Sequence, residues 1–64
     1  MIVEVQIENA QFPNFLDQLE ELFNCDSQEM IQSVKEHDFR TVVKILVEDE
    51  MESRWVIDIA MKLN

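Results

Sequence analysis

The chain has 64 residues and a formal charge of −9, from 14 acidic and five basic side chains. This charge opposes direct binding to nucleic acid, because phosphate contacts need a basic surface, and it also opposes binding to anionic membranes. No apolar run approaches the roughly 20 residues of a membrane-spanning helix, and the first residues lack the positive segment of a secretory signal. The single cysteine, Cys25, fits a reducing compartment. We therefore expect one small acidic domain, residues 1–64, in the cytoplasm.

The first half of the chain predicts a strand followed by two helices. Apolar and polar residues alternate over residues 2–9, which is the period of a strand with one buried face. Residues 12–24 place phenylalanine and leucine at the three-and-four spacing of an amphipathic helix. Asp26 and Glu29 have the spacing of a capping box, so a second helix is expected to begin there and to continue through Val34.

The second half predicts a β-hairpin. Residues 39–48 and 54–63 are rich in β-branched side chains, and the acidic stretch between them is expected to form the turn. Pairing residues whose numbers sum to 102 places Glu48 opposite Arg54, so charge complementarity across the strands favours this register. The predicted fold is α+β, with the order β-α-α-β-β and a three-stranded sheet that has a helical hairpin packed on one face.

The residue patterns of enzymes and metal sites are missing. The chain has no glycine, which excludes phosphate-binding loops and dinucleotide-binding motifs of the usual kind. His37 is the only histidine, and its distance of twelve positions from Cys25 matches no zinc-site spacing. The acidic residues 48–52 lack the calcium-loop pattern, and a domain this small has little room to desolvate catalytic carboxylates. We expect no enzymatic activity, no cofactor and no metal ion.

The charged residues are unevenly distributed. Residues 1–34 contain seven acids and no Lys or Arg, a charge of −7, whereas residues 35–64 contain seven acids and five bases, a charge of −2. On the predicted first helix, Asp17, Glu20 and Glu21 lie opposite the apolar stripe. At these spacings like charges repel by a few tenths of a kcal/mol per pair. Such an acidic face could bind a partner or could simply increase solubility, and the sequence does not favour one explanation over the other.

One hypothesis is that the acidic surface binds a basic partner. A rigid acidic face resembles double-stranded DNA in its electrostatics and can compete for the same basic groove. In profile alone, without a diagnostic motif, the chain resembles short acidic inhibitors that phages and mobile elements direct against restriction, CRISPR or transcription proteins. Such a decoy would bind a basic, nucleic-acid-binding host protein through Asp17, Glu20 and Glu21. The predicted hairpin tip would add a second contact, formed by Asp49, Glu50, Met51 and Glu52.

The other hypothesis is an interaction module that does not imitate DNA, such as a small regulatory subunit or a homodimeric adaptor. If the helices cover one face of the sheet, the predicted hairpin leaves Val42, Leu46, Val56 and Ala60 on the other face. A face this apolar commonly marks an interface. Its partner would be a second copy of the chain or a larger protein.

Overall fold

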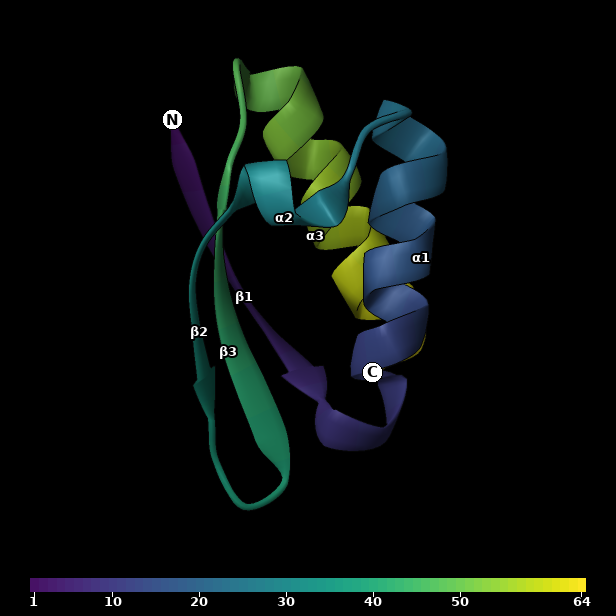
Figure 1. Ribbon diagram of the computed structural model, residues 1–64, viewed down its shortest axis with the longest axis vertical. Coiled ribbons are helices and arrows are strands. Elements are labelled where there is room, and N and C mark those ends of the chain that lie inside the picture. Colours follow the sequence, from purple (N-terminus) through teal and green to yellow (C-terminus); the bar gives the residue numbers. More distant parts are fainter.

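A computed structural model describes residues 1–64, which form a three-stranded sheet covered by helices (Figure 1). In chain order the elements are β1 (Ile2–Glu8), the short 3-10 helix η1 (Asn9–Gln11), α1 (Phe12–Phe23), α2 (Ser27–Met30), β2 (Ile31–Glu36), β3 (Arg40–Leu46) and α3 (Glu50–Leu63). The predicted α+β class, the three-stranded sheet and the order β-α-α-β-β are confirmed. Helix α3 follows these elements and was not expected.

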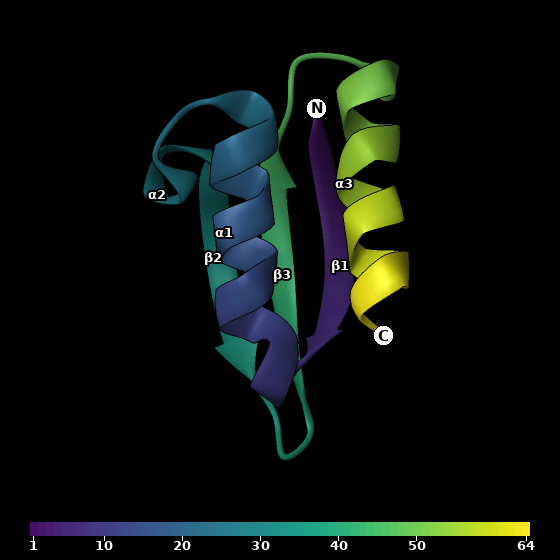
Figure 2. The same ribbon diagram turned by 90° about the vertical axis from the view of Figure 1, so that its right-hand side faces the viewer.

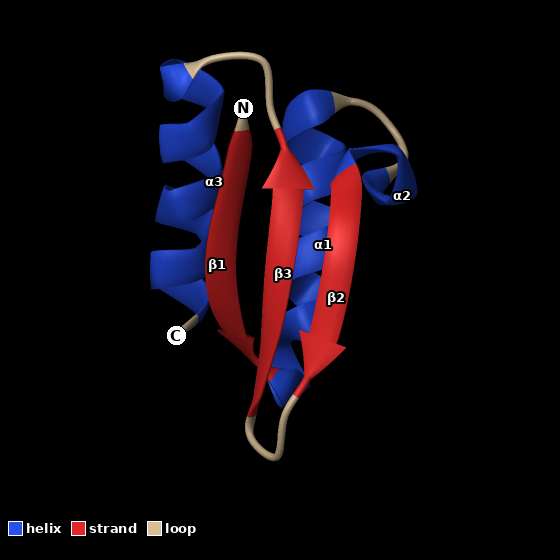
Figure 3. Ribbon diagram, turned by 90° about the vertical axis from the view of Figure 1, so that its left-hand side faces the viewer, coloured by secondary structure: helices blue, strands red, loops and turns tan.

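The sheet is antiparallel, and β3 lies between β1 and β2 (Figure 3). Val3 and Val5 of β1 lie opposite Ile45 and Val43 of β3. Alternate residues of both strands are buried, so one face of the sheet points into the core and the other is open to solvent. The strands predicted for residues 2–9 and for the β3 region are therefore confirmed.

Helix α1 confirms the predicted amphipathic helix. Phe15 and Leu19, four residues apart, are fully buried on the side that faces the sheet. The helix ends at Asn24, whose φ of 54° and ψ of 41° place it in the left-handed region. As expected, Asp26 then caps α2, and its Oδ1 accepts a hydrogen bond from the backbone N–H of Gln28 at 3.0 Å.

The second helix is much shorter than predicted, because the chain becomes extended after Met30. Helix α2 is a single turn of four residues, and Val34 lies in β2, opposite Val43 of β3. The open edge of the central strand carries backbone N–H and C=O groups that need partners, and pairing with β2 supplies them. Residues 31–36 contain two β-branched side chains, which favour a strand over a helix.

The predicted last strand is wrong, because residues 54–63 belong to α3. The buried positions of this helix, Val56, Ile59 and Ala60, follow the three-and-four spacing of a helix rather than the alternation of a strand. Both edges of β3 are already occupied, by β1 on one side and β2 on the other. A strand at residues 54–63 would therefore have no free edge of β3 to pair with, and the predicted pairing of Glu48 with Arg54 does not form.

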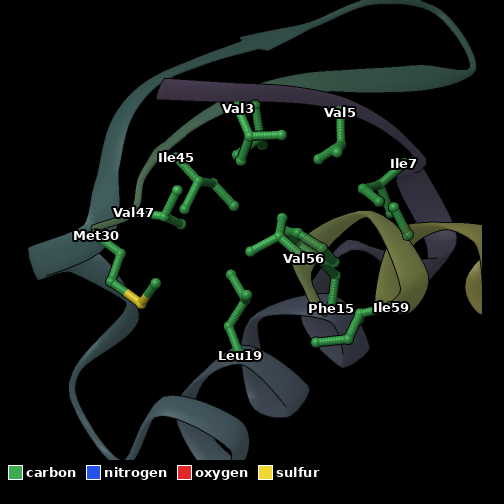
Figure 4. Close-up of a cluster of buried hydrophobic side chains, with 12 residues drawn as sticks. Val3, Val5, Ile7, Phe15, Leu19, Met30, Ile45, Val47, Val56 and Ile59 are labelled. Atoms are coloured by element: carbon green, nitrogen blue, oxygen red, sulfur yellow. The ribbon is translucent and has the colours of Figure 1, made fainter. Parts of the chain in front are cut away.

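The core lies between the inner face of the sheet and the helices α1 and α3, which both pack on that face (Figure 2). Figure 4 shows side chains of β1 pointing toward Val56 of α3 and toward Phe15 and Leu19 of α1. Twelve buried apolar side chains form this cluster: Val3, Val5, Ile7, Phe15, Leu19, Met30, Val43, Ile45, Val47, Val56, Ile59 and Ala60. Because all the helices lie on this side, the opposite face of the sheet remains uncovered (Figure 3).

Candidate protein-binding site

The acidic stretch that was predicted as a hairpin tip forms the beginning of α3. Asp49 is the N-cap, and its Oδ1 accepts a hydrogen bond from the backbone N–H of Glu52 at 2.9 Å. Oε1 of Glu52 accepts a hydrogen bond from the backbone N–H of Glu48 at 2.8 Å. Both carboxylates thus satisfy N–H groups at a helix start, where the helix dipole also favours negative charge. Glu50 and Met51, by contrast, are exposed in the first turn.

We expect Asp49→Ala to lower the free energy of unfolding by about 1 kcal/mol, the usual cost of removing an N-cap acceptor. Asp49→Asn should cost less than half of that, since an amide oxygen can accept the same hydrogen bond. Urea denaturation followed by far-UV circular dichroism measures both changes. Equal losses in the two variants would contradict a capping role for the side chain.

The acidic residues predicted on the first helix are exposed on α1. Asp17, Glu20 and Glu21 lie away from the buried residues Phe15 and Leu19. Their spacing of three and four residues makes them neighbours on the helix surface. Neither α1 nor α2 contains Lys or Arg, so no base within these helices offsets the repulsion among the carboxylates.

The structure brings Glu20 and Glu21 of the predicted helix face to the same end of the molecule as the acidic stretch 49–52, whereas Asp17 lies in the middle of α1 and outside this end. Helices α1 and α3 run antiparallel, so the C-terminal end of α1 lies near the beginning of α3 (Figures 1 and 2). The rings of Phe23 and Trp55 make contact there, with 6.0 Å between their centroids. A hollow of about 410 Å³ also joins both segments; its lining comprises Phe23, Cys25, Met30, Leu46, Val47, Glu48 and Glu52.

We call this region the acidic end. It comprises the eight acidic side chains of residues 20–29 and 48–52: Glu20, Glu21, Asp26, Glu29, Glu48, Asp49, Glu50 and Glu52. Neither segment contains Lys or Arg; Arg54, in the second turn of α3, is the base nearest to them in the sequence. Lys35, Arg40 and Lys44 lie instead on the strands β2 and β3. The acidic end therefore holds eight of the 14 acidic side chains, and its two segments hold none of the five basic ones.

A groove between α1 and α3 was not expected, because residues 54–63 were assigned to a strand. Its volume is about 700 Å³, and its lining comprises Gln18, Glu21, Leu22, Trp55, Asp58, Ile59 and Lys62. Two of its apolar side chains are partly exposed: Leu22 is 47% exposed and Trp55 is 38% exposed. We call it the α1–α3 groove. Glu21 belongs both to this groove and to the acidic end.

The open face of the sheet differs from the predicted apolar surface. Val42 and Leu46 lie on it as expected, and Ile2 stands opposite Leu46. Val56 and Ala60 do not lie on it, since both are buried in the core. The reason is that α3 is a helix whose apolar stripe completes the core, so these two residues turn toward the sheet and not away from it.

Opposite charges face each other across the strands on this open face. Glu4 of β1 lies opposite Lys44 of β3, and Glu8 lies opposite Arg40. Cross-strand pairs of opposite charge contribute roughly 0.2–1 kcal/mol each to a sheet. The open face therefore has the character of a solvated surface along most of β1, with apolar side chains concentrated around Ile2 and Leu46.

No group of three or more His, Cys, Asp and Glu side chains lies close enough together to hold a metal ion. Cys25 is half-buried at the acidic end, whereas His37 is exposed between β2 and β3. None of the helices is long and apolar enough to cross a bilayer. Comparisons with protein-family models, with curated proteins and with solved structures found no match to this chain.

Proposed function

We propose that this chain is a small cytoplasmic protein without enzymatic activity that binds a basic, nucleic-acid-binding partner through its acidic end. It acts as an inhibitor or decoy of the kind that phages and mobile elements use against restriction, CRISPR or transcription proteins. One observation carries the proposal: two acidic segments that lie far apart in the sequence meet at one end of the fold, and neither contains a base.

The acidic end has the properties that electrostatic competition with DNA requires. DNA carries one negative charge per roughly 1.7 Å of its axis, and proteins that bind it present a matching basic surface. Helices α1 and α3 hold four of the eight carboxylates on a packed scaffold, so little backbone conformational entropy is lost there when a partner binds. Three of the eight acids, Asp26, Asp49 and Glu52, accept backbone hydrogen bonds, whereas repulsion among the other five costs stability. Rapid, salt-sensitive association with a basic protein would compensate for that cost.

Two variants with equal net charge test whether the position of the acids matters. The acidic-end variant carries Glu20→Gln, Glu21→Gln, Asp49→Asn and Glu50→Gln, and the control variant carries Glu4→Gln, Glu8→Gln, Glu36→Gln and Asp38→Asn. Each loses four negative charges, so the formal charge of both rises from −9 to −5. Asp49→Asn keeps an oxygen that can cap α3. Thermal unfolding of both variants checks that the fold is retained.

We expect the immobilised chain and the control variant to retain a host protein from a bacterial lysate, and the acidic-end variant to lose it. Raising the salt from about 50 to 200 mM should weaken capture at least ten-fold, because screening and ion competition act on charged contacts. The purified partner should also release a labelled DNA duplex when the chain is added. Equal capture by both variants, or release of no DNA, would contradict the proposal.

The open face of the sheet carries the alternative function, an interaction module that does not imitate DNA, with a second copy of the chain or a larger protein as its partner. The exposed side chains of Ile2 and Leu46, opposite each other on β1 and β3, favour it. The same pair of variants separates the two functions. Binding that survives in the acidic-end variant and in high salt would point to the open face.

A further inference from the structure

We propose that the α1–α3 groove is a binding site for an arginine side chain of a basic protein partner. The inference rests on the proposed function, because it names the chemical group that the partner would present beside the acidic end. It adds an open groove, with an aromatic surface and two carboxylates, to a surface so far described only by its charge.

The apolar part of the groove suits the stem and the plane of an arginine. Trp55 and Leu22 line it from α3 and α1, and both are partly exposed. The indole of Trp55 packs at an interplanar angle of 52° against the ring of Phe23, which restricts its orientation. A guanidinium group stacks favourably on an indole face, and the methylene groups of arginine can cover an exposed leucine.

The charged part of the groove suits a guanidinium as well. Glu21 belongs to α1 and Asp58 belongs to α3, so one carboxylate comes from each wall. Guanidinium carries five N–H donors in a planar fork, which allows it to engage two acceptors while it stacks. The one base in the lining, Lys62, lies in the last turn of α3. It follows Asp58 by four residues and so neighbours it on the helix surface, and the three charged side chains leave the lining with a net charge of −1.

Lysine fits the same groove less well. Its ammonium group is compact and strongly hydrated, so it loses more solvation and gains less from stacking on an indole. A cation–π contact at an exposed site contributes about 0.5–1 kcal/mol, which corresponds to a factor of about two to five in affinity. A groove that binds arginine specifically should therefore have a higher affinity for an arginine peptide than for a lysine peptide of equal charge. A surface that attracts cations only by its negative charge should bind both peptides equally.

The fluorescence of Trp55 reports directly on the groove, because the chain has one tryptophan and no tyrosine. Titration of the native chain with a hexa-arginine peptide should change the emission of Trp55 saturably. A hexa-lysine peptide at the same ionic strength should bind about two to five times more weakly. Replacing both carboxylates, Glu21→Gln with Asp58→Asn, should weaken hexa-arginine binding, because the groove then lacks its two charged acceptors.

A matched control is Glu4→Gln with Glu8→Gln, which removes the same charge from the open face and should preserve the arginine preference. Equal affinities for the two peptides, or no change in Trp55 emission at saturating hexa-arginine, would overturn the arginine site. Either result would leave capture of a partner by the acidic end untouched. Conversely, the chain could prefer hexa-arginine and yet capture no DNA-binding protein. That result would refute the proposed function and support the arginine site.

Discussion

Replacing Val56 by aspartate should unfold the protein, whereas the same substitution at the neighbouring Ile57 should leave it folded. Val56 is fully buried in the core, and Ile57 is 39% exposed on the surface of α3. A carboxylate buried without a partner costs several kcal/mol. A chain of 64 residues has a total stability of only about 3–10 kcal/mol, so one such group is enough to unfold it.

The same pair of variants distinguishes the observed helix from the predicted hairpin. In the hairpin, Ile57 would face the core and Val56 would lie on the open face, so the order of the two effects would be reversed. Urea denaturation followed by far-UV circular dichroism should give a loss of cooperative unfolding for Val56→Asp. For Ile57→Asp we expect a change of less than about 1 kcal/mol. A stable Val56→Asp variant beside an unfolded Ile57→Asp variant would contradict α3.

The elements that could be predicted are those whose hydrophobic period is unambiguous. Strand β1 alternates strictly over seven residues, and α1 carries its apolar side chains at the helical spacing over twelve. The left-handed conformation of Asn24 and the cap at Asp26 also follow from local chemistry, since both depend on the residue and its immediate neighbours. These features do not depend on tertiary contacts with distant segments of the chain.

Helix α3 was missed although a local signal for it was present. Asp49 and Glu52 have the same spacing as Asp26 and Glu29, which predicts a helix start that the structure confirms. The β-branched residues after Arg54 and the apparent charge pairs of a hairpin outweighed that signal. Because short apolar segments have no clear period, β-propensity is weak evidence when a capping pattern precedes the segment.

Strand β2 depends on a contact that lies outside its own sequence. Residues 31–36 have neither a strict alternation nor a full helical stripe, and their burial in the fold is irregular as well. Their conformation follows from pairing with the free edge of β3, including a register shift between Ile31 and Ser33. The local pattern of residues 31–36 alone could not distinguish a strand from the continuation of the preceding helix.

The acidic residues of the candidate site could be predicted from the sequence, but their location at one end of the molecule could not. The acids of α1 and the stretch 48–52 were both identified from charge and spacing, and they are exposed or lie at a helix start. Their position at one end depends on the antiparallel arrangement of α1 and α3. The groove with Trp55 depends on the same arrangement, so it could not be expected while residues 54–63 were assigned to a strand.

The packing of α1 on the sheet holds Glu20 and Glu21 of the acidic end in place, so weakening this packing should reduce binding together with stability. Phe15 is the largest fully buried side chain and lies in the core beneath α1. We expect Phe15→Ala to lower the free energy of unfolding by about 3–5 kcal/mol, which is a large part of the total stability of about 3–10 kcal/mol in a chain of this size. Urea denaturation measures the loss, and capture of the partner should fall in proportion to the unfolded fraction.

Phe39→Ala is the matched control, because it removes the same side chain from a position that is 84% exposed in the loop between β2 and β3. Its effect on stability should stay within about 0.5 kcal/mol. Arg40 and Lys35 mark this part of the sheet as the less acidic end, so partner capture should also be unchanged. A Phe39→Ala variant with native stability but impaired capture would place the binding surface at this loop, and would contradict a site at the acidic end.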